Sequence, residues 1–480
     1  MSKISALIDL GGSSVKVIIC DSEQNKIYQQ EIHIQPIVQG KHIFLSSEKL
    51  FDTVIEAMNL CSLKMPSGRK IDNIFISTLR QGFCLIRKDR ELTPIYLNSD
   101  TSGDFARDDI EKYGKDKIYE ETGHWFAPQL TLPKVINLFR KNPELNSPDT
   151  KLLFVHDWLI WRFTTQLVTE MSLVCAGQMA RISERRIDFE LLNNFNIPSS
   201  ILPTVKKFND KVGDFNNSSK ARLKDYWLNA ELHVGGGDSH FLHMGASRNE
   251  LGKLVVSAGS STPISLLNIS LGNSNLLKPW KSTSFLSNAY FIEGNLGYPG
   301  TYYGWLSKNF KDSILEEEIT LENLASASTI FGSCNMWNEN SWESRPAFSI
   351  LGDFSKSRGK DLLLGLTLDY AFALANQISE FKKDSFDINE VLITGGGSNQ
   401  VLQKILFSLI NLPVTLVSNK NSANNIFSII NQDVYINSET PKSINKLSDE
   451  ISEYLKERAE KHLTLYSELE GTRKVLENVK

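Results

Sequence analysis

Leu232–Ala246 reads LHVGGGDSHFLHMGA, and the rest of the chain is best understood from this stretch outward. An apolar run ends in three glycines, Asp238 follows at once, and small, aromatic and aliphatic residues then recur at helical spacing. The pattern predicts a strand, a glycine turn and a helix that begins at Asp238. Consecutive glycines permit a positive φ or the close approach of a bulky group. Because aspartate is a favoured N-cap residue, the stretch alone is also compatible with an ordinary strand–turn–helix junction.

The composition limits the class of protein. The 480 residues are 41% hydrophobic and 22% charged, which is enough for two or three domains with their own cores. A net charge of −4 argues against nucleic acid or an anionic membrane as partner. The five cysteines are scattered and lack CxxC spacing, which favours a reducing compartment over a zinc site. With no signal-peptide pattern and no apolar run approaching about 18 residues, we expect a soluble cytoplasmic protein.

The two halves of the chain begin alike. Each opens with two apolar strands around a Gly-Ser-Ser turn, Gly12–Ser14 in the first half and Gly259–Ser261 in the second, 259 − 12 = 247 residues apart. The flanking strands are predicted at Ser5–Leu10, Val15–Cys20, Lys253–Ser257 and Pro263–Leu267, and Lys26–Ile34 would complete an antiparallel meander with the first pair. Either small-residue turns coincide here, or the chain is an internal duplication of an α/β domain.

Other elements follow from apolar periodicity. Helices are predicted at Ser47–Leu63, Asp104–Tyr119, Leu132–Phe139, Leu152–Phe163, Thr301–Phe310, Leu362–Phe381 and Ser443–Glu477. Leu362–Phe381 is apolar throughout, which indicates a buried central helix. Further strands are predicted at Ile74–Ser77, Ala289–Glu293, Val391–Thr394 and Pro413–Val417.

Three loops could bind phosphate. Asp9–Lys16, Ala258–Thr262 and Gly395–Ser398 each follow an apolar strand and are rich in glycine and serine. Backbone N–H groups in such loops form nests for phosphate oxygens, and hydroxyls add donors. None matches a P-loop or GxGxxG. Three such loops with an acid on the first fit a nucleotide held between two domains.

Three charged residues have a chemical and an ordinary interpretation. Asp9 could help to hold Mg²⁺ beside phosphate oxygens, or cap its own turn. Lys16 could neutralise phosphate, or lie on the solvent face of a strand. Asp238 could take the proton from an alcohol during phosphoryl transfer, and a helix N-terminus would favour its ionised form.

In order and spacing, the four glycine-containing stretches resemble those of the FGGY carbohydrate kinases. The resemblance covers nearly the whole chain. It implies an α/β fold of two actin-like (ribonuclease-H-like) domains, 1–246 and 247–480, with ATP, Mg²⁺ and a sugar bound in a cleft between them. The N-terminal domain would supply the sugar side and the C-terminal domain the nucleotide side.

The resemblance also implies roles for individual residues. Asp238 matches the catalytic base and Asp9 the acid of the first phosphate loop. The ATP- and phosphate-binding set comprises Gly11, Gly12, Ser13, Ser14, Lys16, Gly259, Ser260, Ser261, Gly396, Gly397 and Asn399. Two departures stand out: Gly12 replaces the family's threonine, and Ser422–Phe427 reads SANNIF where the family has a Gly-Ala-Ala helix.

On the sugar side, Ser77–Leu85 reads STLRQGFCL, similar to the autoinducer-2 kinase branch and unlike the Met-His-Gly of xylulokinases. The implied substrate-binding residues are Arg80, Gln81, Asp100, Trp125 and Glu170, beside Asp238. Arg80 could instead be a surface strand end, and aromatic residues here could serve packing alone. Asp100 lacks the family's flanking tryptophan and arginine, since Asn98 and Ser102 stand in their places.

The sequence therefore predicts an ATP-dependent kinase of a small sugar or polyol: a ketose, a deoxyketose or a linear C5 carbonyl compound. A non-catalytic sugar- or nucleotide-sensing protein of the same fold is the main alternative, motivated by the altered motifs. An actin- or chaperone-like ATPase is a third. A homodimer is the commonest soluble assembly.

Overall fold

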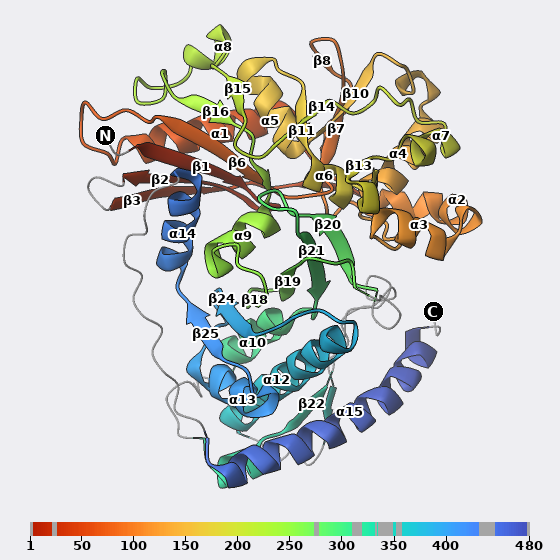
Figure 1. The fold of residues 1–480 in the computed structure, drawn as a ribbon, viewed down its shortest axis with the longest axis vertical. Helices are drawn as coiled ribbons and strands as arrows, with labels where there is room; N and C mark the ends of the chain where they lie inside the picture. Colours follow the sequence, from red (N-terminus) through yellow and green to blue (C-terminus); the bar gives the residue numbers. More distant parts are fainter. Residues whose placement is uncertain are drawn as a thin grey trace. The chain divides into compact units, whose positions relative to one another are not determined.

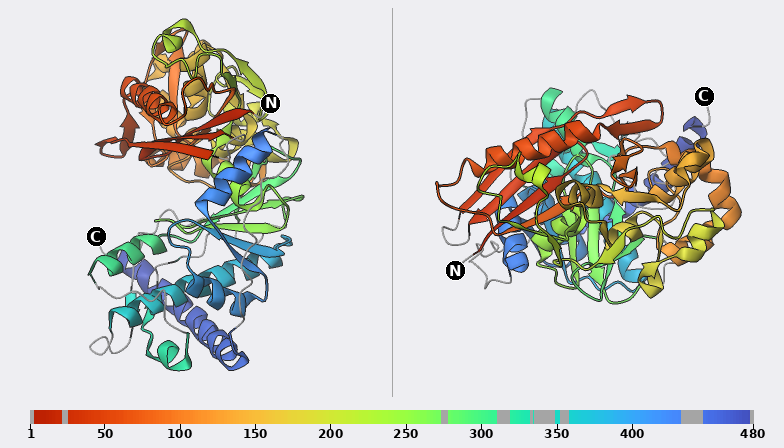
Figure 2. Two further views of the ribbon diagram at one scale, coloured as in Figure 1. Left: turned by 90° about the vertical axis from the view of Figure 1, so that its left-hand side faces the viewer. Right: turned by 90° about the horizontal axis from the view of Figure 1, so that it is seen from above.

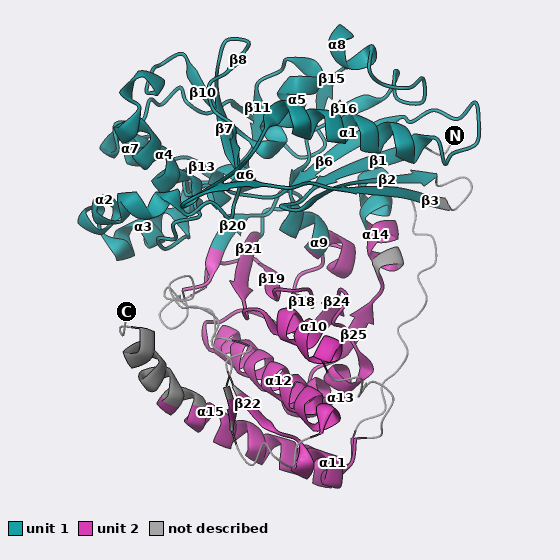
Figure 3. Cartoon of the chain, turned by 180° about the vertical axis from the view of Figure 1, so that it is seen from behind, with its two compact units in different colours: residues 1–242, 281–289, 426–436 teal, residues 243–280, 290–425, 437–480 magenta. Residues whose placement is uncertain are grey.

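The chain folds into two compact units, shown in teal and magenta in Figure 3. The structure, a computed structural model, describes residues 3–21, 26–272, 278–309, 319–331, 334, 349–351, 358–431 and 447–477. Unit 1 comprises Met1–Leu242, Lys281–Ala289 and Ile426–Ile436, and unit 2 comprises His243–Trp280, Tyr290–Asn425 and Asn437–Lys480. The sequence suggested a single division after residue 246. The units instead divide after Leu242, and two later segments return to unit 1.

The strands are short and numerous. Their bounds are β1 Ile4–Leu10, β2 Ser14–Asp21, β3 Lys26–His33, β4 Ile37–Gln39, β5 His42–Leu45, β6 Asn73–Thr78, β7 Phe83–Arg87, β8 Arg90–Glu91, β9 Ile95–Tyr96, β10 Thr150–Phe154, β11 Val168–Glu170, β12 Ala180–Arg181, β13 Arg186–Ile187, β14 Thr204–Lys206, β15 Lys211–Gly213, β16 Glu231–His233, β17 Gly236–Gly237, β18 Lys253–Ser257, β19 Pro263–Asn268, β20 Trp280–Thr283, β21 Tyr290–Asn295, β22 Thr329–Phe331, β23 Ser349–Leu351, β24 Glu390–Thr394 and β25 Val414–Val417.

Along the chain, the helices come between these strands or after the last of them. Their bounds are α1 Ser47–Ser62, α2 Arg107–Tyr113, α3 Lys115–Thr122, α4 Thr131–Lys141, α5 Val155–Thr164, α6 Met171–Ala176, α7 Phe189–Asn194, α8 Asn217–Lys220, α9 Asp238–Ser247, α10 Pro299–Asn309, α11 Leu321–Ser326, α12 Gly359–Lys383, α13 Gln400–Ile410, α14 Asn419–Asn431 and α15 Asp449–Glu477. Short 3₁₀ turns occur at Ser102–Ala106, Pro143–Leu145 and Ile182–Glu184.

The main sheet of unit 1 has the order β15-β16-β6-β1-β2-β3, and β17 also pairs with β6 (Figure 1). β1, β2 and β3 pair antiparallel, which confirms the predicted meander. β1 and β6, and β6 and β16, pair parallel. Helices α1 and α5 provide the crossovers between β3, β6 and β16.

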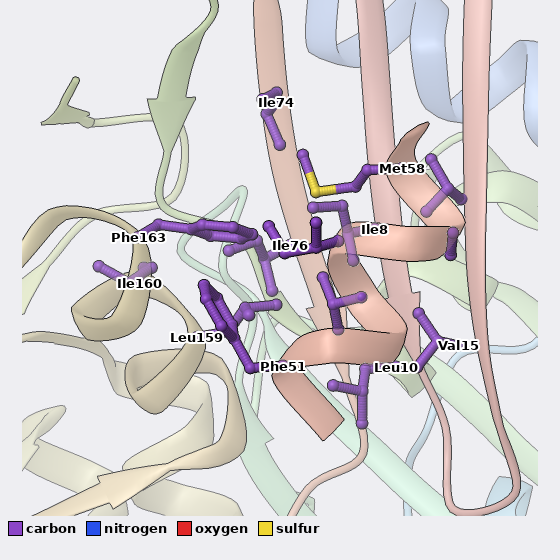
Figure 4. Close-up of a cluster of buried hydrophobic side chains, with 14 of the residues drawn as sticks. Ile8, Leu10, Val15, Phe51, Met58, Ile74, Ile76, Leu159, Ile160 and Phe163 are labelled. Carbon is purple, nitrogen blue, oxygen red and sulfur yellow. The ribbon is translucent and has the colours of Figure 1, made fainter. Parts of the chain in front are cut away.

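One face of this sheet is apolar. Alternate residues of β1, such as Ile8 and Leu10, pack with Ile74 and Ile76 of β6 in one buried cluster. Figure 4 shows these side chains meeting Phe51 and Met58 of α1 and Leu159, Ile160 and Phe163 of α5. α1 runs alongside the red strands β1–β3 in Figure 2. Because strand side chains alternate, the odd-numbered residues of β1 lie on the opposite face.

Unit 2 repeats this topology. Its sheet contains the order β21-β19-β18-β24-β25, with β21, β19 and β18 antiparallel and β18, β24 and β25 parallel. The matching order in unit 1 is β3-β2-β1-β6-β16. In sequence, α12 and α13 stand in unit 2 where α1 and α5 stand in unit 1. The two-domain actin-like fold is confirmed, and the Gly-Ser-Ser turn occupies the bend between the first two strands of each sheet.

Two helix predictions were wrong in detail. Leu152–Phe163 was expected to be one helix, but residues up to Phe154 form β10 and the helix begins at Val155. An unbroken apolar run does not distinguish a buried strand from a buried helix. Asp104–Tyr119 is likewise divided, because Gly114 adopts φ +116 between α2 and α3.

α12 contains the predicted central helix, Leu362–Phe381. By length and composition alone α12 could cross a membrane, contrary to our expectation that no apolar run was long enough. However, 78% of its apolar window is buried inside the fold, as is usual for a core helix. Ser443–Glu477 was predicted helical; α15 covers Asp449–Glu477, and the first residues of that range lie outside the described residues.

Candidate active site

The glycine turn brings Asp238 to the carboxyl ends of three parallel strands of unit 1. Gly236 and Gly237, as β17, pair with Ser77 and Thr78 of β6, and Asp238 is the first residue of α9. On the other side of β6, Ser77 pairs with Asp9 of β1. Carboxyl ends of parallel strands are where α/β sheets bind ligands. The predicted strand–turn–helix is therefore confirmed.

The turn has no room for side chains. A Cβ on Gly235 would come within 1.8 Å of the carbonyl oxygen of Ile76. A Cβ on Gly237 would come within 2.6 Å of Cδ of Arg80. The glycines thus let the chain lie directly against β6 and let the Arg80 side chain pass close to the turn. This explains why three consecutive glycines precede Asp238.

A polar row crosses the sheet at Asp9. Ser77 Oγ donates to Asp9 Oδ1 at 2.7 Å. Lys16 of β2 is the register partner of Asp9, and Glu31 of β3 is the partner of Lys16. Burial raises the pKa of Asp9 and Lys16 partly opposes this rise, so Lys16 acts on the Asp9 carboxylate as well as lying on a strand. This row is on the face opposite the apolar cluster.

Both aspartates have a raised pKa, and Asp238 contributes to the shift of Asp9. Burial raises the pKa of Asp9 to about 6, and the hydrogen bond from Ser77 opposes this rise while Asp238 adds to it. Burial also raises the pKa of Asp238, and Arg80, whose Nε lies 3.8 Å from Asp238 Oδ1, opposes the rise. The Asp238 side chain nonetheless keeps 41% of its surface exposed, so its carboxylate is partly enclosed by protein and partly open to solvent. We expect from the sequence that the helix N-terminus favours ionised Asp238. In the structure burial is the dominant influence and raises the pKa instead.

Arg80 and Gln81 lie on the loop after β6, and Arg80 reaches the site. Gln81 adopts φ +62 and is 7% exposed. Its carbonyl accepts hydrogen bonds from Thr131 Oγ1 at 3.1 Å and Lys134 Nζ at 2.8 Å. The structure, rather than the sequence, shows that Arg80 is more than a surface strand end, since its side chain is 11% exposed and lies beside Asp238.

Sequence reasoning missed Lys134. This lysine of α4 is 2% exposed, and its Nζ donates to Leu97 O at 2.9 Å as well as to Gln81 O. Burial lowers its pKa to about 7, and Asp100 opposes that fall. Lys134 thus joins the loop of Arg80 to the loop that begins at Leu97. A single lysine within the apolar stretch TLPKVINLF was the available signal.

The Asp100 carboxylate is held by β5 and by its own loop. Its Oδ2 accepts from Ile43 N at 2.8 Å, and its Oδ1 accepts from Ser102 N at 2.9 Å and from Ser102 Oγ. The side chain is fully buried. These bonds give Asp100 a structural task, and its substrate-binding role stays a prediction. Nearby Asn98 is closer to the phosphate loop: its Oδ1 would lie 3.7 Å from a Cβ on Gly12.

Glu170 lies near the turn. Its Oε2 caps α6 through Ser172 N at 2.8 Å and would be 3.7 Å from a Cβ on Gly236. Burial raises the pKa of Glu170 to about 7. Trp125 is 3% exposed. The substrate-binding role of Trp125 also stays a prediction.

The first phosphate loop is a tight turn. Gly11 N donates to Ser14 O at 2.9 Å, and Ser13 O accepts from Ile34 N at 2.9 Å. Gly12 and Ser13 are exposed, so the backbone and the hydroxyl at the tip of the turn can be reached by a ligand.

In unit 2 the two predicted loops lie together. Gly397 N donates to Ala258 O at 2.7 Å, which joins the Gly395–Gly397 turn to the loop containing Gly259. Gly300, near the start of α10, packs so closely that a Cβ would come within 1.9 Å of Gly259 O. Ser260 and Gly396 are exposed, and a Cβ on Gly396 would meet nothing within 4 Å. Ser261 is partly exposed.

Asn399 and the SANNIF stretch have local partners. Asn399 Oδ1 accepts from Leu402 N at 2.8 Å as the N-cap of α13, and its Nδ2 donates to Gly397 O. Ser422–Phe427 lies within α14, where Asn425 Nδ2 donates to Gly245 O at 2.7 Å. Contact of Asn399 with adenine stays a prediction.

The residues fit a nucleotide–magnesium pair. Among the described residues, no group of three His, Cys, Asp or Glu side chains could hold a metal by itself. Mg²⁺ commonly takes one or two carboxylates together with phosphate oxygens and water. Asp9 would supply such a carboxylate, and its raised pKa indicates that the protein leaves its charge only partly compensated.

Comparison with known proteins agrees with this geometry. Residues 4–241, about half of the chain, match the model of the FGGY family of carbohydrate kinases, N-terminal domain. A xylulose kinase of Bacillus subtilis is 26% identical over 53% of this chain, and the match spans 51% of that enzyme's length. A xylulose kinase of Staphylococcus xylosus is 21% identical over 85% of this chain and 86% of its own.

The fold is shared with solved structures. Plasmodium falciparum glycerol kinase with ADP superposes with a TM-score of 0.81 at 17% identity, covering 98% of each chain. At that identity the likeness concerns the fold. Together with the matched N-terminal domain, it confirms the resemblance drawn from the glycine motifs: the chain belongs to the FGGY family of carbohydrate kinases, enzymes that use ATP with Mg²⁺.

Proposed function

We propose that this protein transfers the γ-phosphoryl group of ATP to a hydroxyl of a small sugar or polyol, with Asp238 as general base. The acceptor class we favour is a ketose, a deoxyketose or a linear C5 carbonyl compound. The single observation that carries the proposal is the setting of Asp238. The Asp238 side chain is partly exposed, burial raises its pKa, and Arg80 Nε lies 3.8 Å from its Oδ1.

Such a setting suits proton transfer. The acceptor hydroxyl oxygen attacks the γ-phosphorus, Asp238 Oδ accepts the hydroxyl proton, and the bond to ADP breaks. A base whose pKa is raised toward neutrality holds that proton better than an ordinary carboxylate. Mg²⁺, when bound, screens the phosphate charge. Arg80 opposes the rise in the pKa of Asp238, which favours the ionised form, and it offers donors to an acceptor oxygen.

We assign the remaining residues by their exposure and chemistry. Gly12 and Ser13 in unit 1, and Ser260 and Gly396 in unit 2, present backbone and hydroxyl groups to phosphates. Asp9 and Lys16 lie opposite one another and would act on the metal and on phosphate charge, respectively. The names of the relatives, xylulose and glycerol kinases among them, support a polyhydroxylated acceptor without choosing one.

The test is an ADP-release assay over a panel of acceptors. It would include ribulose, xylulose, rhamnulose, erythrulose, glycerol and dihydroxypentanedione, with ³¹P NMR to identify a phosphate monoester. We expect one acceptor class to raise ADP release far above the rate with ATP alone. ATP binding without turnover on any member would instead favour the sensing protein. Turnover stimulated by a protein partner and indifferent to sugars would favour the chaperone-like ATPase.

A further inference from the structure

A buried histidine fastens the turn that precedes Asp238. His156 lies in the first turn of α5 and is fully buried. Its Nε2 is 3.0 Å from the backbone nitrogen of Gly235, and its Nδ1 is 2.9 Å from Asp157 Oδ1. The sequence pattern did not single out this residue, and nothing in the proposed mechanism uses it.

The two partners determine the ring's protonation. A backbone N–H can only donate, so Nε2 of His156 must accept and carries no proton. A neutral imidazole then carries its proton on Nδ1, where it donates to the carboxylate of Asp157. Asp157 is held in turn, since its Oδ2 accepts from Phe154 N at 3.2 Å. This series of hydrogen bonds therefore links the first turn of α5 to the glycine turn.

The contact with Gly235 adds something that packing does not. The close approach of Gly235 to Ile76 keeps the turn against β6, and β17 pairing fixes the positions of Gly236 and Gly237. Neither fixes the plane of the peptide that joins Val234 to Gly235. The carbonyl of this peptide accepts from Asn209 N at 2.9 Å. Its N–H is held three residues before Asp238 by His156, a ring that is itself oriented by Asp157.

We propose that His156, protonated on Nδ1 and oriented by Asp157, is a positioning residue that fixes the Gly235 peptide and thereby the direction of the Asp238 carboxylate. The inference rests on the proposed role of Asp238 as base. A displacement of a reacting group by about 1 Å can cost about 10²-fold in rate. The effect of His156 should accordingly appear in kcat, because nucleotide binding depends on other loops.

The test compares two substitutions of similar size. His156→Phe keeps a ring but removes the acceptor, and His156→Gln can place Oε1 near the position of Nε2. We expect kcat to fall about 10-fold or more in His156→Phe and to stay within about 3-fold of the parent in His156→Gln, with KM for ATP unchanged in both. Asp157→Asn should resemble His156→Phe, because an amide donor facing Nδ1 would move the ring proton to Nε2.

Leu159→Ala is the matched control. Leu159 is fully buried on the same helix and has no polar contact with the turn. We expect it to lower Tm without lowering kcat. Equal kcat in His156→Phe and in the parent would overturn the proposal, as would a fall in Leu159→Ala as large as that in His156→Phe.

A spectroscopic arm is independent of turnover. In protein labelled with ¹⁵N-histidine, the resonance that disappears in His156→Gln should show an unprotonated Nε2 and a protonated Nδ1. The opposite tautomer would overturn the proposal even if the variants lose activity. If instead Asp238→Asn retains full activity, the proposed function fails, and the tautomer measurement still decides whether His156 accepts from Gly235.

Discussion

The two sheets share a strand order and differ in what they carry at the same edge. In unit 1 the ends of β1, β6 and β17 bring together Asp9, Ser77 and Asp238. In unit 2 the ends of β18 and β24 lead into Ala258–Ser261 and Gly395–Ser398, which contain no acidic residue. The shared topology thus carries small-residue turns in both units and carboxylates at this edge in one. The difference teaches that topology supplies the edge, whereas a few side chains decide its chemistry: under the proposed function, proton transfer in unit 1 and phosphate binding in unit 2.

The largest expected effect is loss of the base from unit 1. Asp238→Asn should lower kcat by about 10²- to 10⁴-fold, the usual range for a general base, and leave ADP affinity within about 2-fold. Steady-state kinetics and calorimetric titration with ADP check this. Full turnover in the variant would remove Asp238 from the mechanism.

The glycine turns should respond differently to one added methyl group. Gly235→Ala drives Cβ into the Ile76 carbonyl and should destabilise the protein by about 3 kcal/mol or more. Gly396→Ala has open space, so stability should change by no more than about 0.5 kcal/mol while ADP affinity falls. Urea unfolding and ADP titration measure both. Equal destabilisation by the two variants would contradict the contrast between a packed turn and an open one.

A smaller effect is expected at Lys134, which has polar partners in unit 1 only. Lys134→Met leaves the carbonyls of Gln81 and Leu97 without the Nζ donor and loosens the loop of Arg80. KM for the acceptor should rise about 10-fold, corresponding to about 1.4 kcal/mol, with KM for ATP unchanged. Val135→Ala, also fully buried on α4, is the control and should change stability alone. A rise in the KM for ATP equal to that for the acceptor would refute this role.

The smallest effect concerns the stability of the ligand-free protein. The pKa of Asp9 is about 6 in the fold and 3.8 as the reference value, so folding favours its protonated form. Ionised Asp9 therefore destabilises the fold, and this cost grows as pH rises from about 4 to 6. Asp9→Asn should raise Tm by about 2–3 °C at pH 8 and have no effect below pH 4, as thermal unfolding across pH can show. A constant difference at all pH values would exclude titration of Asp9 as the cause.

The sequence predicted local features well and long-range encounters poorly. The β1–β3 meander, the glycine turn and the start of α9 follow from alternation, glycine and an N-cap within a few residues. The approach of Arg80 to Asp238 joins residues far apart in sequence, and only the parallel pairing of β17 with β6 reveals it. Lys134 and His156 were missed because a polar residue within an apolar helix signals burial without naming its partner. Leu152–Phe154 was misassigned because an apolar run has no period.

The chemistry of unit 1 depends on whether Asp9 is an odd or an even residue of β1, because alternate residues of a strand face opposite sides of the sheet. Asp9 faces the site because it is an odd residue of a strand whose even residues, Ile8 and Leu10, fill the apolar cluster. Insertion of one residue early in β1 would turn every later side chain to the opposite face and send the carboxylate into the core. Insertion of two would restore the alternation. Insertions within β1 that keep both the apolar face and the carboxylate in place should therefore come in even numbers of residues, whereas surface loops are free to differ by any number.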